Sequence, residues 1–287
     1  MRFGFVVPHG DARDFAQVAA LGERHGWDGV FTWEAVWGVH AWVTLGAASM
    51  VTERIRLGTL LTPVSRWKPW DLASAVGTAD RLSGGRVIVG AGMGALHGGW
   101  TAFEADEGRR TRAEKLDECL AIYAGLMRGQ PFAYSGKHYS AKPTDFFPPD
   151  PPVQRPHPPV WMVGAHVAGK EQQPSLDRAA RWDGLLPQII DGDERRGVAS
   201  PGELAELVSL VTARRDEIGL AGAPYDVIIE ADSTEEFVQL DPAEPAAWEA
   251  AGATWWIESW WGVPAGTEGL DEVKRRVQAG PPAASLR

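Results

Sequence analysis

The chain has a single cysteine, Cys119, in 287 residues, which excludes an intrachain disulfide and suits a reducing compartment. It has no run of basic residues and a formal net charge of −10, which argues against nucleic acid or an anionic membrane as a partner. Residues 35–52 are uncharged but contain glycines, a histidine and hydroxyl side chains, and therefore make a poor membrane span. Pro8 and Asp11 interrupt the apolar start that a signal peptide needs. We expect a cytoplasmic protein whose partners are small molecules or other proteins.

Several catalytic motifs are also missing. The seven histidines form no HExxH or similar ligand spacing, so no metal site is expected. No Gly-x-Ser-x-Gly elbow and no P-loop occur, which removes the usual support for serine hydrolysis and phosphoryl transfer.

The stretch from Arg54 to Gly94 is the most informative one present. It contains two short β-rich apolar runs, Ile55 to Leu61 and Arg86 to Ala91, which are typical of buried parallel strands. Between the runs, apolar residues recur at helical spacing from Leu72 to Leu82. This is a strand–helix–strand crossover, and ligands bind at the carboxyl ends of the strands in such sheets.

The same alternation runs along the whole chain. Helix starts are indicated by Asp11, by a capping-box spacing at Thr111 to Glu114, by Ser200-Pro201-Gly202-Glu203 and by Asp241-Pro242. The further strands are expected at residues 2–7, 29–33, 159–164, 184–186, 225–231 and 253–257, with helices at 171–182 and 268–279 among those between them. Eight strands alternating with eight helices predict an α/β fold, a TIM-like (β/α)8 barrel spanning residues 1–287 as a single domain.

Residues 131–158 interrupt the alternation between strands four and five. A hairpin turned at Ser135-Gly136 is followed by the proline-rich stretch 147–159. Such a stretch could be a domain linker. We favour an insertion packed on the barrel, because the alternation resumes directly after it.

The glycine-rich segment 90–95 fits the form of a dinucleotide fingerprint but lacks the following helix and the acidic residue about 20 positions on. We interpret these glycines as letting the backbone of a barrel strand approach a flat ring or a phosphate. The alternative is a loop that simply needs positive φ angles.

Polar residues follow most of the predicted strands. Glu34 stands out because a carboxylate among tryptophans, here Trp33 and Trp37, tends to have a raised pKa and can serve as an acid or base. A structural hydrogen bond to backbone is the competing interpretation. The candidates at the strand ends are His9, Glu34, His40, Thr59, Thr62, His97, His166, Gln188 and Glu258.

Several motifs together resemble the luciferase-like monooxygenase family. They are Ile55 to Thr59 with Pro63, Arg66 and Pro69, the stretch Ala79 to Arg86 with Gly90 to Gly94, Arg112 to Leu126, Gly136 to Tyr139, Pro158 to Gly164, Arg178 to Gly184 and Ala251 to Thr254. The resemblance covers most of residues 1–265. It implies a TIM-like barrel that binds FMN or the deazaflavin coenzyme F-420 at the carboxyl ends of the strands.

The resemblance also implies positions for the cofactor. The ring would lie against the end of strand three, often at a cis peptide or bulge, and tryptophans would wall the ring or the substrate. The backbone of the strand-four glycines and the loop after strand five would hold the ribityl chain and phosphate. The implied cofactor-binding residues are Trp33, Thr59, Leu60, Leu61, Arg66, Gly92, Met93, Gly94, Gly164, Ala165 and His166, with Lys170 as a further counter-charge and Trp37, Trp67 and Trp161 as further wall residues.

One position departs from the family pattern. Many members have a catalytic histidine just after strand two, whereas this chain has Trp33-Glu34-Ala35 there and its nearest histidine at His40. Glu34 takes the polar role or His40 reaches back into the pocket, and His9 is a third candidate catalytic group.

These implications lead to an expected oxidoreductase acting on a small organic substrate. FMN would support monooxygenation and coenzyme F-420 would support hydride transfer, with a separate flavin reductase or F-420-reducing enzyme as a partner and a homodimer as the family's usual assembly. The alternatives are a non-catalytic flavin-binding protein and a cofactor-free hydrolase or lyase on the same barrel.

Overall fold

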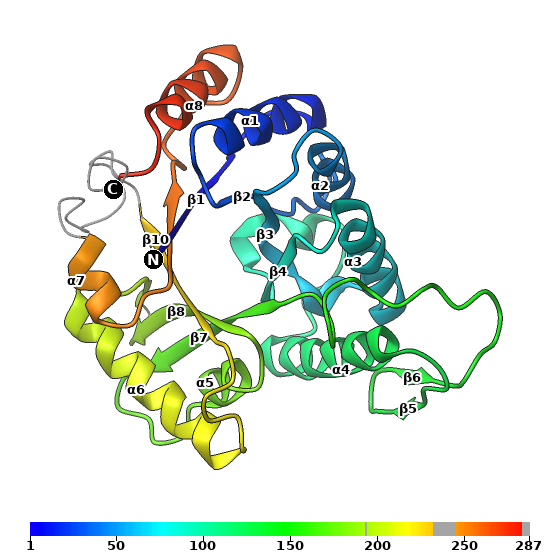
Figure 1. The fold of residues 1–287 in the computed structure, drawn as a ribbon. Coiled ribbons are helices and arrows are strands. Elements are labelled where there is room, and N and C mark those ends of the chain that lie inside the picture. Colours follow the sequence, from blue (N-terminus) through cyan, green and yellow to red (C-terminus); the bar gives the residue numbers. More distant parts are fainter. Residues whose placement is uncertain (193, 232–244, 283–287) are drawn as a thin grey trace.

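The computed structural model describes residues 1–192, 194–231 and 245–282, and within them eight parallel strands close into a barrel (Figure 1). The strands run in the order β10-β11-β1-β2-β3-β4-β7-β8, and β8 pairs with β10 through Asp226 opposite Gly184. Their bounds are β1 Arg2–Val6, β2 Gly29–Thr32, β3 Arg56–Pro63, β4 Val87–Gly92, β7 Val160–Val167, β8 Gly184–Asp191, β10 Asp226–Ala231 and β11 Trp255–Ser259. The TIM-like barrel predicted from the sequence is confirmed.

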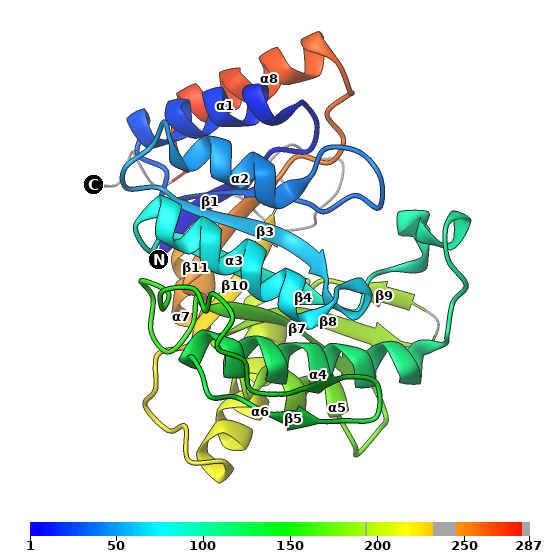
Figure 2. The same ribbon diagram turned by 90° about the vertical axis from the view of Figure 1, so that its right-hand side faces the viewer.

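Helices surround the barrel and connect successive strands. They are α1 Ala12–Arg24, α2 Ala41–Ser49, α3 Pro69–Ser83, α4 Arg109–Arg128, α5 Pro174–Ala179, α6 Pro201–Glu217, α7 Pro245–Ala250 and α8 Thr267–Ala279, with the short 3-10 turns η1 Val64–Arg66, η2 Leu96–Gly98 and η3 Trp100–Ala102. The last described helix, α8, packs beside α1, although the two helices are far apart in the sequence (Figure 2). The predicted start of α7 at Asp241 lies outside the described residues.

Local sequence signals explain most helix starts. The Asp11 carboxylate accepts from the backbone of Arg13 and Asp14 and completes a capping box, and Ser200 accepts from the Glu203 backbone. The capping box predicted at Thr111 is wrong. α4 begins three residues earlier, after Gly108 at φ 86°, whose N–H donates to Asp106 instead.

The elements around strand five differ most from the prediction. α5 begins only at Pro174, because the Gln173 side chain donates to the carbonyls of Val167 and Lys170 and holds the preceding chain as a loop. β7 and β8 are longer than predicted, since they pair with each other as far as Val167 and Ile190. β8 also pairs with an antiparallel strand, β9 Glu194–Arg196, which sequence reasoning missed.

The barrel interior is filled by side chains. Phe31, Trp161 and Trp255 pack against one another there in edge-on or tilted contacts, and each is fully buried. At the carboxyl ends of the strands, Leu60, Leu186 and Ile228 top this inner cluster. The barrel therefore has a packed floor and no pore.

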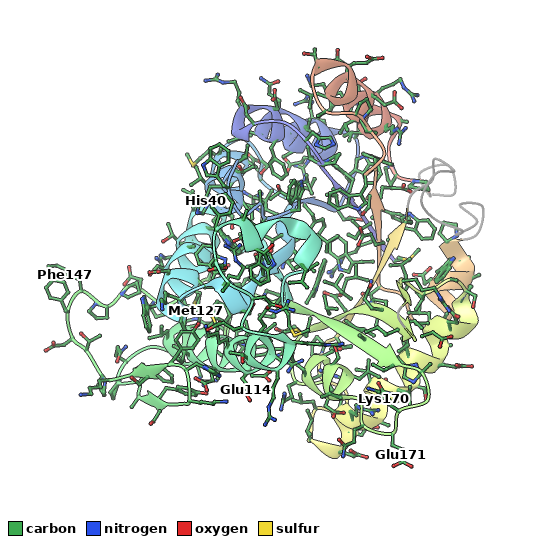
Figure 3. The ribbon with its side chains drawn as sticks, turned by 180° about the vertical axis from the view of Figure 1, so that it is seen from behind. His40, Glu114, Met127, Phe147, Lys170 and Glu171 are labelled. Carbon is green, nitrogen blue, oxygen red and sulfur yellow. The ribbon has the colours of Figure 1, made fainter. Side chains whose placement is uncertain are left out.

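The insertion between α4 and β7 is held against the barrel by hydrogen bonds to the buried carboxylate of Asp80. It contains a hairpin as predicted, β5 Tyr134–Ser135 with β6 Ser140–Ala141, but the turn lies at residues 136–139, because Ser135 pairs with Ser140. Asp80 of α3, fully buried, accepts from the backbone of Val153 and Gln154 at 2.6 and 3.1 Å. Between these anchors a loop carries Phe147 away from the barrel (Figure 3).

Among the residues that the structure describes, no helix is both long enough and apolar enough to cross a membrane.

Candidate active site

A cavity of about 510 Å³ opens at the carboxyl ends of the barrel strands. Its walls come from the ends of β3, β4, β7, β8 and β10 and from the segments after β2 and β11. The size lies within the range of small-molecule sites, and the side chains that line it are mostly apolar. Because the packed barrel closes its floor, a ligand can enter only from the rim.

The end of β3 forms one wall of the cavity. The pairing of β3 with β4 slips between Thr59 and Thr62, and the peptide between Leu60 and Leu61 is cis. Leu60 and Leu61 therefore face the cavity. Thr59 does not, because it is fully buried and its hydroxyl is bonded to the backbone of Gly90.

The glycine turn after β4 lies directly beside this wall. Gly92 pairs with Pro63, and a Cβ on Gly92 would lie 3.0 Å from the Leu61 side chain. Gly94 has a φ of 79°, which favours glycine. Hydrogen bonds of 2.7 Å from Ser65 to the Met93 carbonyl and from Arg112 to the Gly94 carbonyl hold the turn. The turn thus presents bare backbone to the cavity.

Glu34 follows β2 and lines the cavity together with Trp33. Its Oε1 accepts from Trp67 Nε1 at 2.6 Å, while its Oε2 is buried and has no hydrogen-bond partner of normal geometry among the described residues. Trp33 is fixed by its indole N–H, which donates to the Pro8 carbonyl at 2.8 Å. The Glu34 carboxyl thus keeps one oxygen buried beside the cavity without a hydrogen bond of normal geometry to the described residues.

Burial raises the pKa of the Glu34 carboxyl above its ordinary value. The Thr62 hydroxyl and the Trp67 indole oppose this rise, as do the charges of His40 and Arg66, but desolvation outweighs them. A carboxyl in this state can hold a proton closer to neutral pH than an exposed glutamate can.

Three arginines contribute to the cavity lining. Arg66 pairs with Glu104, and Arg178 makes a two-pronged contact with Asp117 at 2.6 and 2.8 Å. Arg109, at the start of α4, is exposed and forms no ion pair with the described residues. The rim therefore offers positive charge to an anionic group of a ligand.

The structure brings most of the candidate residues together in this cavity. Those that line it are Trp33, Glu34, Leu60, Leu61, Arg66, Gly92, Met93, Gly94 and Ala165, together with Gln188. Those that do not line it are His9, His40, Thr59, Thr62, Gly164, His166 and Glu258, and the side chain of His97 lies outside what is described.

The histidine candidates lie off the cavity. His40 is exposed at the start of α2, and its ring meets the edge of Trp67 with centroids 6.2 Å apart. His9 is half-buried after β1. Lys170, a proposed counter-charge, lies on the exposed turn after β7 (Figure 3).

The tryptophan wall differs from the expectation. Trp37 is 86% exposed, and Trp161 is fully buried inside the barrel, where it donates to Asp226. Trp100 and Trp261 line the cavity instead. Trp100 and Trp261 lie outside the barrel strands, and only the closure of the barrel determines that they reach the cavity. The residues next to them in the sequence therefore gave no signal that they line it.

Sequence reasoning also missed the far wall of the cavity. Leu186, Pro187, Ile228 and Glu230 come from β8 and β10, and the Glu230 carboxylate accepts from Trp261 at 2.8 Å. The only available signal was the position of these residues near the ends of predicted strands.

The fold and site define a (β/α)8 barrel with a cavity at the rim, lined by a strand-three bulge, a glycine-containing turn and a glutamate with a buried carboxyl group. The chain belongs to the luciferase-like monooxygenase family, whose model matches residues 1–276.

Relatives of known sequence add little about activity. Uncharacterised proteins of Mycobacterium tuberculosis (strain H37Rv) and Mycobacterium bovis are each 40% identical to this chain over 159 residues. The matched stretch is 53% of this chain and 52% of each relative, so the alignment spans about half the length of the curated relatives.

Solved structures share the fold over a longer range. The coenzyme F-420-dependent tetrahydromethanopterin reductase of Methanopyrus kandleri matches with a TM-score of 0.70 at 17% identity, over 97% of this chain and 98% of its own. An F-420-dependent secondary alcohol dehydrogenase, in complex with an F-420–acetone adduct, gives a TM-score of 0.70 at 15% identity over 96% and 98%.

An FMN-containing structure matches less completely. The oxygenating constituent of 3,6-diketocamphane monooxygenase from Pseudomonas putida, in complex with FMN, gives a TM-score of 0.61 at 18% identity. The match covers 81% of this chain and 68% of that one. The fold is thus shared by oxidoreductases that use either cofactor.

Proposed function

We propose that this protein is an oxidoreductase that binds coenzyme F-420 or FMN in the rim cavity and acts there on a small organic substrate. The observation that carries the proposal is the cavity wall that Leu60 and Leu61 of β3 form together with Gly92 and Gly94 after β4. A flat tricyclic ring can pack against such an apolar surface, where the two glycines carry no side chain.

The cavity fits this kind of group in three respects. Its volume of about 510 Å³ and apolar lining suit a planar ring. A Cβ on Gly92 would press on Leu61, so the absence of a side chain keeps the wall open. Arg109 lies at the rim without an ion pair to the described residues and would bind a phosphate there.

Coenzyme F-420 is the cofactor to test first. The two neighbours that match along nearly their whole length are F-420-dependent enzymes, whereas the FMN-bound neighbour matches along 68% of its chain. When bound, a deazaflavin accepts or donates hydride, and a reduced flavin can also activate oxygen.

The residues of this chain would supply binding, orientation and proton transfer. Trp33 and Trp261 flank the cavity and shield it from water. Glu34 is the proton-transferring group, because its Oε2 makes no hydrogen bond of normal geometry with the described residues and burial raises the pKa of its carboxyl above that of an exposed glutamate. We expect reduced cofactor to come from a separate reductase or F-420-reducing enzyme.

The proposal is tested by titrating the purified protein with oxidised F-420 and, separately, with FMN, while following the fluorescence of the ring. We expect micromolar affinity for one of the two. Gly92→Ala should weaken that affinity about tenfold, because its methyl pushes Leu61 toward the ring. Gly202→Ala in α6 is the matched control, since a Cβ there meets only Ser200 at 3.8 Å.

Binding of neither cofactor would refute the proposal and favour a cofactor-free barrel enzyme. Tight binding without turnover of any substrate by the reduced cofactor would instead favour a cofactor-carrying protein. Equal affinities of the two glycine variants would place the ring away from the Gly92 turn.

A further inference from the structure

Trp67 is the polar neighbour that holds Glu34 in place. It directly follows η1, and its indole Nε1 donates to Glu34 Oε1 at 2.6 Å, a short distance typical of a charge-assisted bond. Because this bond occupies Oε1 alone, Oε2 stays buried beside the cavity and makes no hydrogen bond of normal geometry with the described residues. The orientation of the carboxyl thus depends on where Trp67 lies.

The backbone of Trp67 is in turn held by two other elements. The Tyr139 hydroxyl, from the hairpin of the insertion, donates to the Trp67 carbonyl at 3.3 Å. The Cys119 thiol of α4 lies 3.9 Å from the same oxygen. Lys68 lies over the Tyr139 ring at 5.7 Å, and Trp70 meets that ring edge-on at 6.4 Å. The insertion therefore reaches the candidate site through Trp67.

The hairpin itself has a fixed position relative to the barrel. Glu118 of α4 accepts from the backbone of Lys137, His138 and Tyr139 at 2.7 to 3.0 Å. A continuous series of hydrogen bonds thus runs from Glu118 through Tyr139 and Trp67 to Glu34.

We propose that Trp67 is a positioning residue, which fixes Glu34 through Oε1, leaves Oε2 to the substrate, and is itself held by the Tyr139 hydroxyl of the insertion. The proposal rests on the proposed role of Glu34 in proton transfer. It adds a task for the insertion, which otherwise lies outside the cavity.

The charged and titratable groups around Glu34 are few among the described residues. His40 of the α2 start and Arg66 of η1 face it, and Arg66 is paired with Glu104. Burial raises the pKa of Cys119 to about 12 and that of Tyr139 to about 12, so both stay protonated while Glu34 titrates. A change in the Glu34 titration midpoint after a Trp67 substitution therefore does not arise from ionisation of Cys119 or Tyr139.

The test compares Trp67→Phe with Trp70→Phe by ¹³C NMR of glutamate carboxyls in the cofactor-free protein. The Glu34 signal is assigned as the one lost in Glu34→Gln. Removing the indole N–H removes a bond that favours the ionised carboxyl, so the Glu34 midpoint should move to higher pH in Trp67→Phe. Trp70→Phe makes the same change beside the same tyrosine and should leave the midpoint unchanged.

Tyr139→Phe tests the contribution of the insertion and keeps the proposal testable should Trp67→Phe fail to fold. It should move the midpoint in the same direction by a smaller amount, because it loosens Trp67 without removing the N–H. In turnover, Trp67→Phe should lower kcat about tenfold with little change in KM, and its pH profile should shift as the NMR midpoint does.

Equal midpoints in Trp67→Phe and the wild type would overturn the proposal, and an unmoved midpoint in Tyr139→Phe would remove the insertion from it. A failure of the proposed function would look different. In that case the midpoints would still shift as expected, while Glu34→Gln would leave turnover unchanged.

Discussion

Glu34 carries a carboxyl group whose burial is unfavourable for its ionised form. Its neighbours are aromatic, one oxygen is unpaired, and burial raises its pKa. Groups of this kind reduce stability where they serve activity.

This reasoning predicts a pH-dependent effect of Glu34→Gln on stability. The folded protein holds the Glu34 proton more tightly than the unfolded chain does, so wild-type stability falls as the pH rises through the raised pKa. The variant should therefore gain stability relative to wild type between pH 4 and pH 8, by about 1 kcal/mol. Urea unfolding of both proteins at pH 4 and pH 8 measures how their difference in unfolding free energy changes with pH. Any packing effect of the substitution that does not depend on pH is the same at both pH values and therefore cancels.

Glu217→Gln is the control for this measurement, because Glu217 is exposed at the end of α6. A relative stability of Glu34→Gln that is the same at both pH values would show that burial does not perturb Glu34. In turnover assays Glu34→Gln should lower kcat at least a hundredfold.

At the scale of elements, the α4–insertion contact is the least expected feature of the fold. Burial raises the pKa of Glu118, but its hydrogen bonds from His138, Tyr139 and Lys137 outweigh that effect and lower it overall. Its contribution to stability is thus present at neutral pH and is lost as the pH falls through the lowered pKa. One side chain on α4 fixes three consecutive residues of the hairpin.

Glu118→Ala should release the hairpin while the barrel stays folded. We expect a loss of about 1 to 2 kcal/mol, since three backbone donors lose a charged acceptor but can turn to water. Limited proteolysis should then cut within residues 131–158 faster than in wild type. Glu217→Ala serves as the control, and an unchanged cleavage rate in Glu118→Ala would mean that other contacts hold the insertion.

Much of the element order could be predicted because the strands carry buried apolar runs and the helices begin at good caps. The Asp11 and Ser200 starts are correct for that reason. The misplaced start of α4 and the shortened α5 share one cause: a side chain from the preceding loop, Asp106 or Gln173, fixes the chain there. Hydrogen bonds from a loop side chain to the backbone beside a helix start do not appear in the pattern of apolar residues, so this pattern could not predict them.

The candidate site could be predicted in part. Residues of the near wall, such as Glu34, Leu61 and Gly92, lie at strand ends in a recognisable stretch and were found. Ile228 and Glu230 of the far wall come from a strand with ordinary alternation, and only barrel closure brings them opposite Glu34. Thr59 and Trp161, which were also expected near the cofactor, do not line the cavity, because both side chains are fully buried in the barrel.

At the scale of the whole molecule, α2 presents an apolar face to the surface. The helix contains no charged residue, and Val43, Met50 and Val51 on and after it are 64%, 69% and 53% exposed. Contiguous exposed apolar side chains of this kind usually mark a contact with another protein. We expect the homodimer suggested by the family resemblance to bury this face.

Sedimentation at micromolar concentration tests that expectation. The wild type should sediment as a dimer of 31.1 kDa chains, and the double variant Val43→Lys, Met50→Lys should sediment as a monomer. Ile218→Lys, a comparable change at the end of α6, should leave the dimer intact. A wild-type monomer, or a double variant that remains dimeric, would exclude this face as the interface.

A tricyclic redox cofactor is proposed to lie against the wall that the β3 bulge and the glycine turn of β4 form together. A crystal structure of the protein with whichever of oxidised F-420 and FMN binds would test it most directly. The account predicts ring density against Leu60, Leu61 and the backbone of Gly92 to Gly94, with Glu34 Oε2 facing the same space. Ring density elsewhere on the protein, with the Leu61 and Met93 side chains filling that space, would contradict it.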